Sequence, residues 1–326
     1  MIISKTPLRI SFAGGGTDIS DFYEKEVGAV VSTSIDKYVY LAIHKFFEDK
    51  YLLKYSKTEC VDEIGKIEHP LIRECLVKSG LQDKLEITSF ADIPSSGGSG
   101  LGSSSAFTVG LLKALNHFKG VDVSNYNIAE SACDIEINKL KAPIGKQDQY
   151  ACASGGLNLI EFSKGGKVTV SPIKMSNTDL RGLESHLIMF YTGITRSANT
   201  ILTEQKSNMS SYDKQRILSK MRDSAHVLAI KLAKGDYQCM GQILHQGWVL
   251  KKQLANGIST SDIDTYYNKA LSLGAVGGKI LGAGGGGFLL FYCDPSKQKN
   301  LIDNLGLRHF PFKFDRKGTR IEYNGG

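Results

Sequence analysis

The sequence lacks any apolar stretch near the roughly 20 residues that a membrane-spanning helix needs. The apolar run at its N-terminus, Met1–Ile3, is too short for a secretory signal peptide. Basic residues are scattered, without a run of five or more, and no nucleic-acid-binding motif occurs. These absences predict a cytoplasmic protein that binds neither membranes nor nucleic acid.

Cysteine is sparse as well, and the sequence contains no CxxC pair. The six cysteines are Cys60, Cys75, Cys133, Cys152, Cys239 and Cys293. Such wide spacing excludes a disulfide framework or a zinc motif and indicates free thiols in a reducing compartment.

What the sequence has is length, apolar residues and glycine. Its 326 residues, 41% of them hydrophobic, allow two domains of roughly 150 residues each. A polar stretch at 175–184 places the predicted boundary between residues 1–178 and 179–326. The net charge of +7 (40 basic minus 33 acidic residues) suits an anionic ligand. Nothing in the sequence predicts the oligomeric state.

Hydrophobic periodicity predicts strands and helices that interleave without a strict βαβ rhythm, which favours an α+β fold over a doubly wound sheet. The expected strands are 2–3, 8–12, 27–35, 38–44, 51–55, 85–90, 156–162, 168–170, 185–191, 287–293, 311–314 and 320–323. The expected helices are 71–78, 104–118, 127–140, 197–207, 211–233, 236–254, 261–273 and 295–304.

A glycine- and serine-rich loop, residues 94–105, stands between a predicted strand and a predicted helix. Glycine lets backbone N–H groups turn toward an anion, and the N-terminus of the following helix favours negative charge. The arrangement predicts a phosphate-binding loop. It is not a Walker A loop, because no GxxxxGK[ST] sequence occurs.

A second glycine run, residues 282–287, formally matches GxGxxG. A dinucleotide-binding turn requires a helix after these glycines, whereas Phe288–Tyr292 is typical of a strand. The run therefore indicates either a tight hairpin turn or a glycine ridge that abuts the phosphate loop.

If the loop holds a nucleotide for phosphoryl transfer, the site also needs Mg²⁺ on the phosphates and usually a carboxylate near the acceptor hydroxyl. Glu136 on the predicted helix 127–140 and Asp148 in the loop 145–149 are candidates. Spacing alone does not distinguish them from solvated surface carboxylates.

Three motifs in order resemble those of the GHMP kinases, the family of galactokinase, homoserine kinase and mevalonate kinase. They are PLRISFAGGGTD at 7–18, the Pro94–Ala106 loop containing GLGSSSA, and KILGAGGGGF at 279–288. The resemblance implies an N-terminal domain like domain 2 of ribosomal protein S5, a ferredoxin-like C-terminal domain, and an active site between them.

The resemblance also implies roles for single residues and the use of ATP and Mg²⁺. Asp148 matches the aspartate that faces the acceptor hydroxyl, either as general base or as an orienting group. Arg9 matches the basic residue of the first motif, which would lie near Asp148 and favour its ionised form. Glu136 and Ser104 match the magnesium ligands.

The remaining residues fall into three sets. The ATP-phosphate set is Ser96, Gly97, Gly98, Ser99, Gly100, Leu101, Gly102, Ser103, Ser104 and Ser105. The substrate set is Gly15, Gly16, Thr17, Asp18, Lys146 and Arg196, of which Lys146 and Arg196 are the candidates for a cationic pocket. The set expected to brace the phosphate loop is Gly284, Gly285 and Gly286.

Within the family, the GGGTD form of the first motif looks most like the bacterial D-glycero-D-manno-heptose 7-phosphate kinases. GKQDQY at 145–150 and YTGITRS at 191–197 look similar to the same enzymes. This implies a sugar kinase that phosphorylates the anomeric hydroxyl of a phosphorylated sugar, on the way to nucleotide-activated heptose for surface polysaccharide. A fucokinase-like enzyme and a regulator that binds nucleotide or sugar without turnover are the alternatives.

Overall fold

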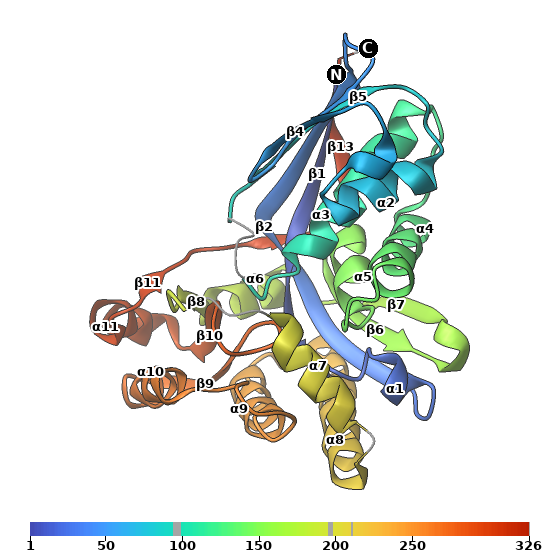
Figure 1. The fold of residues 1–326 in the computed structure, drawn as a ribbon. Helices are drawn as coiled ribbons and strands as arrows, with labels where there is room; N and C mark the ends of the chain where they lie inside the picture. Colours follow the sequence, from blue (N-terminus) through green and yellow to red (C-terminus); the bar gives the residue numbers. More distant parts are fainter. Residues whose placement is uncertain (94–98, 195–197, 210, 326) are drawn as a thin grey trace.

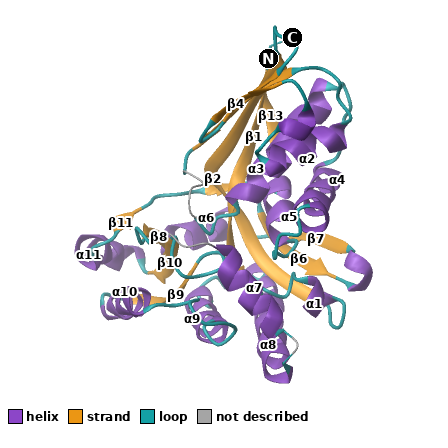
Figure 2. Cartoon of the chain, viewed as in Figure 1, coloured by secondary structure: helices purple, strands orange, loops and turns teal. Residues whose placement is uncertain are grey.

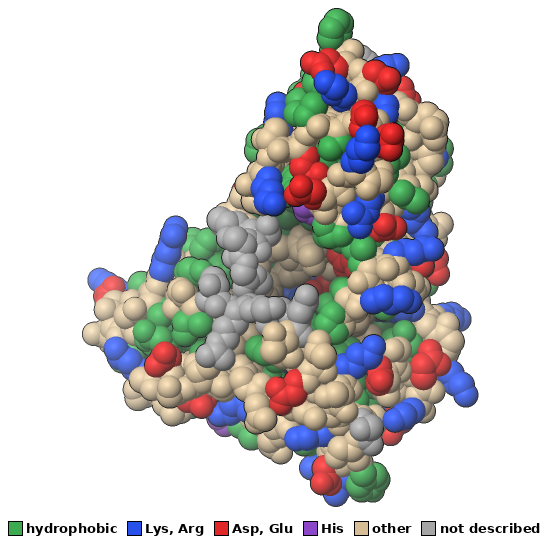
Figure 3. All heavy atoms as spheres, in the orientation of Figure 1, with side chains coloured by type: hydrophobic (Ala, Val, Ile, Leu, Met, Phe, Trp, Pro, Cys, Tyr) green, Lys and Arg blue, Asp and Glu red, His purple; other side chains and the backbone are tan. Residues whose placement is uncertain are grey.

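The computed structural model describes residues 1–93, 99–194, 198–209 and 211–325. Figure 1 shows two parts, each built on a sheet, and Figure 2 shows helices packed against both. Figure 3 shows one face of the molecule, where basic and acidic side chains are interspersed and the surface is hollowed between the two parts.

The first part contains a nine-stranded sheet whose main path runs β13-β1-β2-β5-β3-β4, with β6, β7 and β12 attached through β2. Its strands are β1 (Ile2–Ala13), β2 (Gly28–Lys45), β3 (Tyr51–Lys54), β4 (Thr58–Val61), β5 (Leu85–Ala91), β6 (Leu157–Phe162), β7 (Val168–Pro172), β12 (Phe314–Asp315) and β13 (Arg320–Asn324).

Helices of the first part cover one face of this sheet and frame the site. They are α1 (Ser20–Tyr23), α2 (Pro70–Ser79), α3 (Ser103–Phe118), α4 (Asn125–Cys133) and α5 (Gln147–Ser154), with the 3-10 helices η1 (Ile64–Lys66) and η3 (Lys164–Gly166) and the π-helix η2 (Asp134–Lys139). Helices α3 and α5 both contact β1 and β2. Ser124 caps α4, since its Oγ accepts a hydrogen bond from Asn127 N at 3.2 Å.

The second part contains a four-stranded sheet in the order β11-β8-β10-β9. Its strands are β8 (Leu187–Tyr191), β9 (Ala275–Ile280), β10 (Phe288–Cys293) and β11 (Arg308–His309). Helices α6 (Asn177–His186), α7 (Ala198–Asn208), α8 (Tyr212–Ala233), α9 (Met240–Lys251), α10 (Ser261–Ser272) and α11 (Pro295–Leu305) complete it.

Two apolar cores share elements across the boundary. The larger core lies under the first sheet but also takes in Ala225 and Leu228 of α8. The smaller core lies under the second sheet but takes in Phe22 of α1, which is fully buried. Helix α8 contacts β2 as well as α9, so the two parts are packed together rather than loosely linked.

The C-terminus returns to the first part, which corrects the expectation that 179–326 form one unit. Strand β12 pairs with β2, and β13 pairs with β1 from Ile2↔Asn324 to Lys5↔Arg320. A single boundary at 178/179 therefore does not describe the chain. Its last strands complete the sheet that its first strand begins (Figure 1).

Several predicted elements are extended or changed. The sheet has one long β1 and one long β2 where the sequence predicts two short strands each, because register shifts at Pro7/Leu8 and Ser11/Ala13 bend β1 without ending it. The polar stretch 175–184 includes most of helix α6, which is capped by Ser176. Within the described residues, no helix is long and apolar enough to cross a membrane.

Candidate active site

The phosphate loop runs into α3, and its described part begins at Ser99; Ser96, Gly97 and Gly98 lie outside the described residues. Gly102 has a left-handed φ of 75° directly before the helix, and its carbonyl accepts the first helical hydrogen bond, from Ala106 N at 2.8 Å. By helix geometry the N–H groups of residues 103–105 have no acceptor within the helix. They form the kind of N-terminus that binds phosphate.

Leu101 and Ser99 of this loop also hold the loop in place. Leu101 is fully buried, and its N–H points to Ser99 Oγ at 3.3 Å while its carbonyl accepts from Arg9 N at 2.9 Å. Ser99 Oγ also lies 2.9 Å from Ser103 Oγ. These bonds fix the loop against β1 just before α3 begins.

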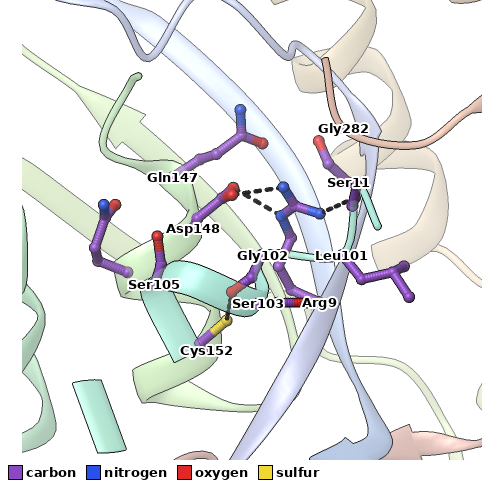
Figure 4. Close-up of polar contacts among 12 residues, drawn as sticks. Arg9, Ser11, Leu101, Gly102, Ser103, Ser105, Gln147, Asp148, Cys152 and Gly282 are labelled. Atoms are coloured by element: carbon purple, nitrogen blue, oxygen red, sulfur yellow. Dashed lines mark hydrogen bonds and ion pairs between the residues drawn. The ribbon is translucent and has the colours of Figure 1, made fainter. Parts of the chain in front are cut away.

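Arg9 on β1 and Asp148 on α5 meet beside the phosphate loop, as the sequence predicts. Arg9 donates from Nε to Asp148 Oδ1 at 2.7 Å and from Nη2 to Oδ2 at 2.6 Å. Its third nitrogen, Nη1, donates to Gly100 O at 2.6 Å. Figure 4 shows the paired groups between α5 and β1. One guanidinium thus fixes the carboxylate and the phosphate loop relative to each other.

Asp18 faces the same site from the turn after β1. Its Oδ1 accepts from Gly16 N at 2.9 Å and from Gln147 Nε2 at 2.9 Å. Gly145 lies against it, because a Cβ there would be 2.0 Å from Asp18 Oδ2. Burial, and then the neighbouring Asp148 carboxylate, raise the pKa of Asp18.

A cavity of about 90 Å³ joins these groups. It is lined by Arg9, Ser11, Gly15, Gly16, Asp18, Ile19, Ile144, Gly145, Gln147, Asp148, Leu202, Gln205, Lys251, Lys279, Gly282 and Ala283. Among the residues that the structure describes, Ser11 Oγ and Gln147 Oε1 are buried and have no hydrogen-bond partner. A hydroxyl and an amide oxygen without partners are suited to a ligand rich in hydroxyl groups.

Glu136 lies in the π-helix η2 and is 2% exposed. Its Oε1 accepts from Thr108 Oγ1 at 2.8 Å, and its Oε2 accepts from Ser105 Oγ at 2.8 Å and from Gln149 Nε2. Burial raises the pKa of Glu136 to about 7. Ser105 is thus a loop serine that contacts Glu136.

The metal-binding roles of Glu136 and Ser104 remain predictions. Ser104 is exposed at the start of α3. Among the described residues, no group of three or more His, Cys, Asp and Glu side chains could hold a metal ion by itself. Oxygen donors at a buried carboxylate without a cationic partner nevertheless fit a Mg²⁺ that also takes ligands from nucleotide phosphates.

Two residues of the predicted substrate set face away from the cavity. Thr17 Oγ1 donates to Gly14 O at 2.8 Å and accepts from Ala29 N at 3.0 Å, so it closes the turn instead. Lys146 Nζ donates to Gly166 O at 2.8 Å, so its ammonium does not line the cavity. Arg196 lies outside the described residues, whereas Gly15, Gly16 and Asp18 line the cavity.

Within the described residues, the glycine run after β9 abuts the phosphate loop through Gly282, which lies outside the predicted set. A Cβ on Gly282 would lie 2.3 Å from Gly100 Cα, and one on Gly100 would lie 2.4 Å from Leu281 O. By contrast, Gly284 and Gly286 approach the carbonyls of Ile258 and Ile194. Among the described residues, 281–282 make the contact with Gly100, and the bracing role of Gly284, Gly285 and Gly286 stays a prediction.

The sequence analysis missed two buried lysines of the cavity, Lys251 and Lys279, each 6% exposed. Lys279 belongs to the third motif, but no role was assigned to it. Lys251 follows Met240, Leu244 and Trp248 on the apolar stripe of α9. The sequence signal for Lys251 is its position on an apolar stripe, because a lysine is rarely buried unless it is paired.

Comparison with known proteins agrees with this site. The model of the GHMP kinase N-terminal domain matches residues 67–156, and that of the C-terminal domain matches 228–311. The chain is 32% identical to D-glycero-alpha-D-manno-heptose 7-phosphate kinase of Campylobacter jejuni, over 98% of both proteins. The chain belongs to the GHMP kinase family.

Two further matches extend this result. The crystal structure of a D-glycero-D-manno-heptose 1-phosphate kinase from Bacteroides thetaiotaomicron has a TM-score of 0.82 at 26% identity, and the match covers 100% of both chains. An L-fucokinase/L-fucose-1-P guanylyltransferase of Bacteroides fragilis is 27% identical over 89% of this chain and 34% of that protein. As a GHMP kinase, the chain transfers a phosphoryl group from ATP to a hydroxyl group, and its closely similar relatives are sugar kinases.

Proposed function

We propose that this kinase phosphorylates the anomeric C1 hydroxyl of D-glycero-D-manno-heptose 7-phosphate and gives the 1,7-bisphosphate. The observation that carries the proposal is the 32% identity to the heptose 7-phosphate kinase over 98% of both chains. The cavity supports it, since Asp18, Gln147 and Ser11 offer hydrogen-bonding groups to a polyhydroxylated ligand beside Asp148. The product would serve nucleotide-activated heptose and surface polysaccharide synthesis.

In the proposed reaction a lone pair of the C1 hydroxyl oxygen forms a bond to the γ-phosphorus of ATP. The bond from that phosphorus to the β–γ bridging oxygen breaks, and its electron pair leaves with ADP. Asp148 takes the hydroxyl proton or orients the hydroxyl while the proton leaves to solvent. Arg9 holds the Asp148 carboxylate through two hydrogen bonds, so the carboxylate is fixed before the sugar arrives.

Mg²⁺ fits beside Glu136, with Ser104 or Ser105 as hydroxyl partner. When bound, it would neutralise charge on the nucleotide phosphates. The chain's own contribution is to keep Glu136 in place through Ser105, Thr108 and Gln149.

The direct test is an ATP-consumption assay with heptose 7-phosphate, L-fucose and D-galactose, with ³¹P NMR of the product. Turnover of heptose 7-phosphate alone, with a new anomeric phosphate signal, is the expected result. Turnover of fucose instead would favour the second candidate, a fucokinase, which the similarity to the Bacteroides fragilis protein supports. No turnover with any sugar would favour a binding protein without catalysis.

Recognition of the phosphate already on the sugar requires a cation, and Arg196 remains the candidate from the sequence. Arg196→Ala is expected to raise KM for the sugar phosphate by at least about 10-fold, with KM for ATP nearly unchanged. Lys146→Ala is the matched comparison, because the Lys146 ammonium contacts Gly166 O rather than the cavity. Equal effects of Arg196→Ala on both substrates would contradict the assignment.

A further inference from the structure

Lys251 and Lys279 bring two positive charges into the cavity from different elements of the second part. Lys251 ends α9, and Lys279 lies on β9. Both side chains are almost fully buried and both line the same cavity as Arg9 and Asp148. Buried ammonium groups are expensive unless an opposite charge accompanies them.

Within the described part of the chain, neither ammonium is paired with an opposite charge. Lys251 Nζ donates to Gly282 O, and Lys279 Nζ donates to Ser11 O at 2.8 Å and Phe12 O at 3.4 Å. Among the described residues, no carboxylate forms an ion pair with either lysine. An ammonium has three N–H donors, so Lys251 keeps two for a ligand and Lys279 keeps one.

The nearby carboxylates are already engaged. Both oxygens of Asp148 accept from Arg9, and Asp18 accepts from Gly16 and Gln147. Burial, and then the positive charge of Arg9, lower the pKa of Lys251 to about 8. For Lys279, burial comes first, followed by the charges of Lys251 and Arg9, and its pKa is lowered as well. The site therefore has an unmatched positive charge that an anion would relieve.

The position of Lys251 indicates which anion it binds. The carbonyl that holds Lys251 belongs to Gly282, the residue in close contact with Gly100 of the phosphate loop. Arg9 Nη1 donates to the carbonyl of the same Gly100. Lys251 thus reaches the cavity where the phosphate loop meets Asp148, between the expected positions of the nucleotide and of the acceptor hydroxyl.

We propose that Lys251 is a further catalytic residue, which binds the oxygens of the γ-phosphoryl group during its transfer, with Lys279 positioned behind it as a second positive charge. As the acceptor oxygen bonds to phosphorus and the bond to ADP breaks, the Lys251 ammonium stabilises the negative charge on the three phosphoryl oxygens. The inference rests on the proposed function for the identity of the acceptor sugar, but its nucleotide part requires only the kinase activity.

The test compares Lys251→Met with Lys252→Met, because the two lysines are adjacent and differ in environment. Lys252 is partly exposed and pairs with Asp264 at 3.0 Å, outside the cavity. Binding of ATP and ADP is measured by calorimetry in Mg²⁺ buffer without sugar. Lys251→Met is expected to weaken the binding of ATP by about 10-fold or more and the binding of ADP by less than about 2-fold. Lys252→Met should change neither.

Turnover gives the second readout. With whichever sugar the wild-type enzyme accepts, Lys251→Met should lower kcat by about 100-fold or more. Lys251→Arg keeps a permanent charge and should recover part of that loss, which a purely structural role would not explain. If Lys251→Met does not fold, Lys251→Gln replaces it in both measurements.

Two results would overturn the inference. If Lys251→Met binds ATP and ADP as the wild type does but binds heptose 7-phosphate more weakly in a ³¹P NMR titration, the lysine serves the phosphate already on the sugar. If it matches Lys252→Met in nucleotide binding and kcat, the lysine is only structural. Failure of heptose 7-phosphate as substrate would leave the nucleotide measurement intact, so the two proposals fail separately.

Discussion

At Asp148, replacing the carboxylate by an amide keeps an oxygen for Arg9 but removes the negative charge. Asp148→Asn is expected to lower kcat by about 10²–10⁴-fold, because it removes the group that takes or orients the hydroxyl proton. ATP binding should change less than about 3-fold, since Asp148 faces the acceptor side of the cavity. The measurement is steady-state kinetics together with nucleotide calorimetry, with thermal unfolding as the check on folding. Wild-type kcat would rule out a catalytic role.

The pH dependence of kcat/KM reports the free enzyme and gives a second test at this scale. Lys251 faces Arg9, Asp18, Asp148 and Lys279, and its pKa is about 8. Because the amine is neutral above this pH, kcat/KM should fall as the pH rises through about 8. Lys251→Arg should remove this alkaline limb, and Lys252→Met should retain it. A limb that persists unchanged in Lys251→Arg would mean that another group titrates.

Single residues were predictable where a motif carried them and unpredictable where only packing did. Arg9, Asp18 and Asp148 came from motif resemblance, and the structure places them around one cavity. Lys146 belongs to the same motif as Asp148, yet its ammonium contacts Gly166 O. A motif gives the order of residues, whereas the direction of a long side chain depends on neighbours that are remote in sequence.

Among the elements, the phosphate loop and the turn after β9 are in close contact at Gly100. Gly100→Ala places a Cβ 2.4 Å from Leu281 O at a φ of +76°, so the loop must move. We expect ATP affinity to fall at least about 10-fold and the protein to be destabilised by more than the roughly 1 kcal/mol that a positive φ costs. Calorimetry and thermal unfolding measure the two effects.

The matched control is Gly120→Ala. Gly120 has a similar φ of +73°, but a Cβ there meets nothing within 4 Å. It should show the conformational cost alone and leave ATP affinity unchanged. Similar losses in both variants would show that the contact with Leu281 contributes nothing to nucleotide binding.

The predicted helix 127–140 shows what periodicity does not resolve within an element. The structure changes from α-helix to π-helix at Asp134, and Leu140 N donates to Ile135 O at 2.9 Å, five residues back. The wider turn lies at Glu136, whose carboxylate contacts Ser105 and Thr108 of α3. Apolar spacing indicated a helix there, but the extra residue in the turn depends on this buried polar cluster.

At the scale of the molecule, the chain cannot be divided between its two parts by one cut. Deleting residues 314–326 removes β12 and β13, which leaves β1 with an unpaired edge and removes one partner strand of β2. The truncated protein is expected to unfold at a lower temperature and to aggregate in gel filtration. Deleting only residues 325–326 keeps both strands and should leave the melting temperature within about 2 °C. A stable, monodisperse 1–313 fragment would contradict this.

The α+β class, the order of most elements and the family were predictable because strand and helix periods are local and three motifs span the chain. The return of β13 to β1 was not, because strand pairing over more than 300 residues leaves no mark in a local pattern. The same reason explains why one boundary at 178/179 does not account for residues 314–324, which pair with the first sheet. The polar stretch chosen for that boundary contains Ser176, which caps a helix that packs beside β8.

The meeting of the two chain ends bears on how the protein is made. Met1 O accepts a hydrogen bond from Gly325 N at 2.9 Å, and both ends lie together in Figure 1. A ribosome adding roughly 5–20 residues per second needs about 16–65 s for the chain. For that time β1 has β2 on one side but lacks β13 on its other edge. Joining the ends and opening the chain elsewhere would let β13 and β1 emerge in succession.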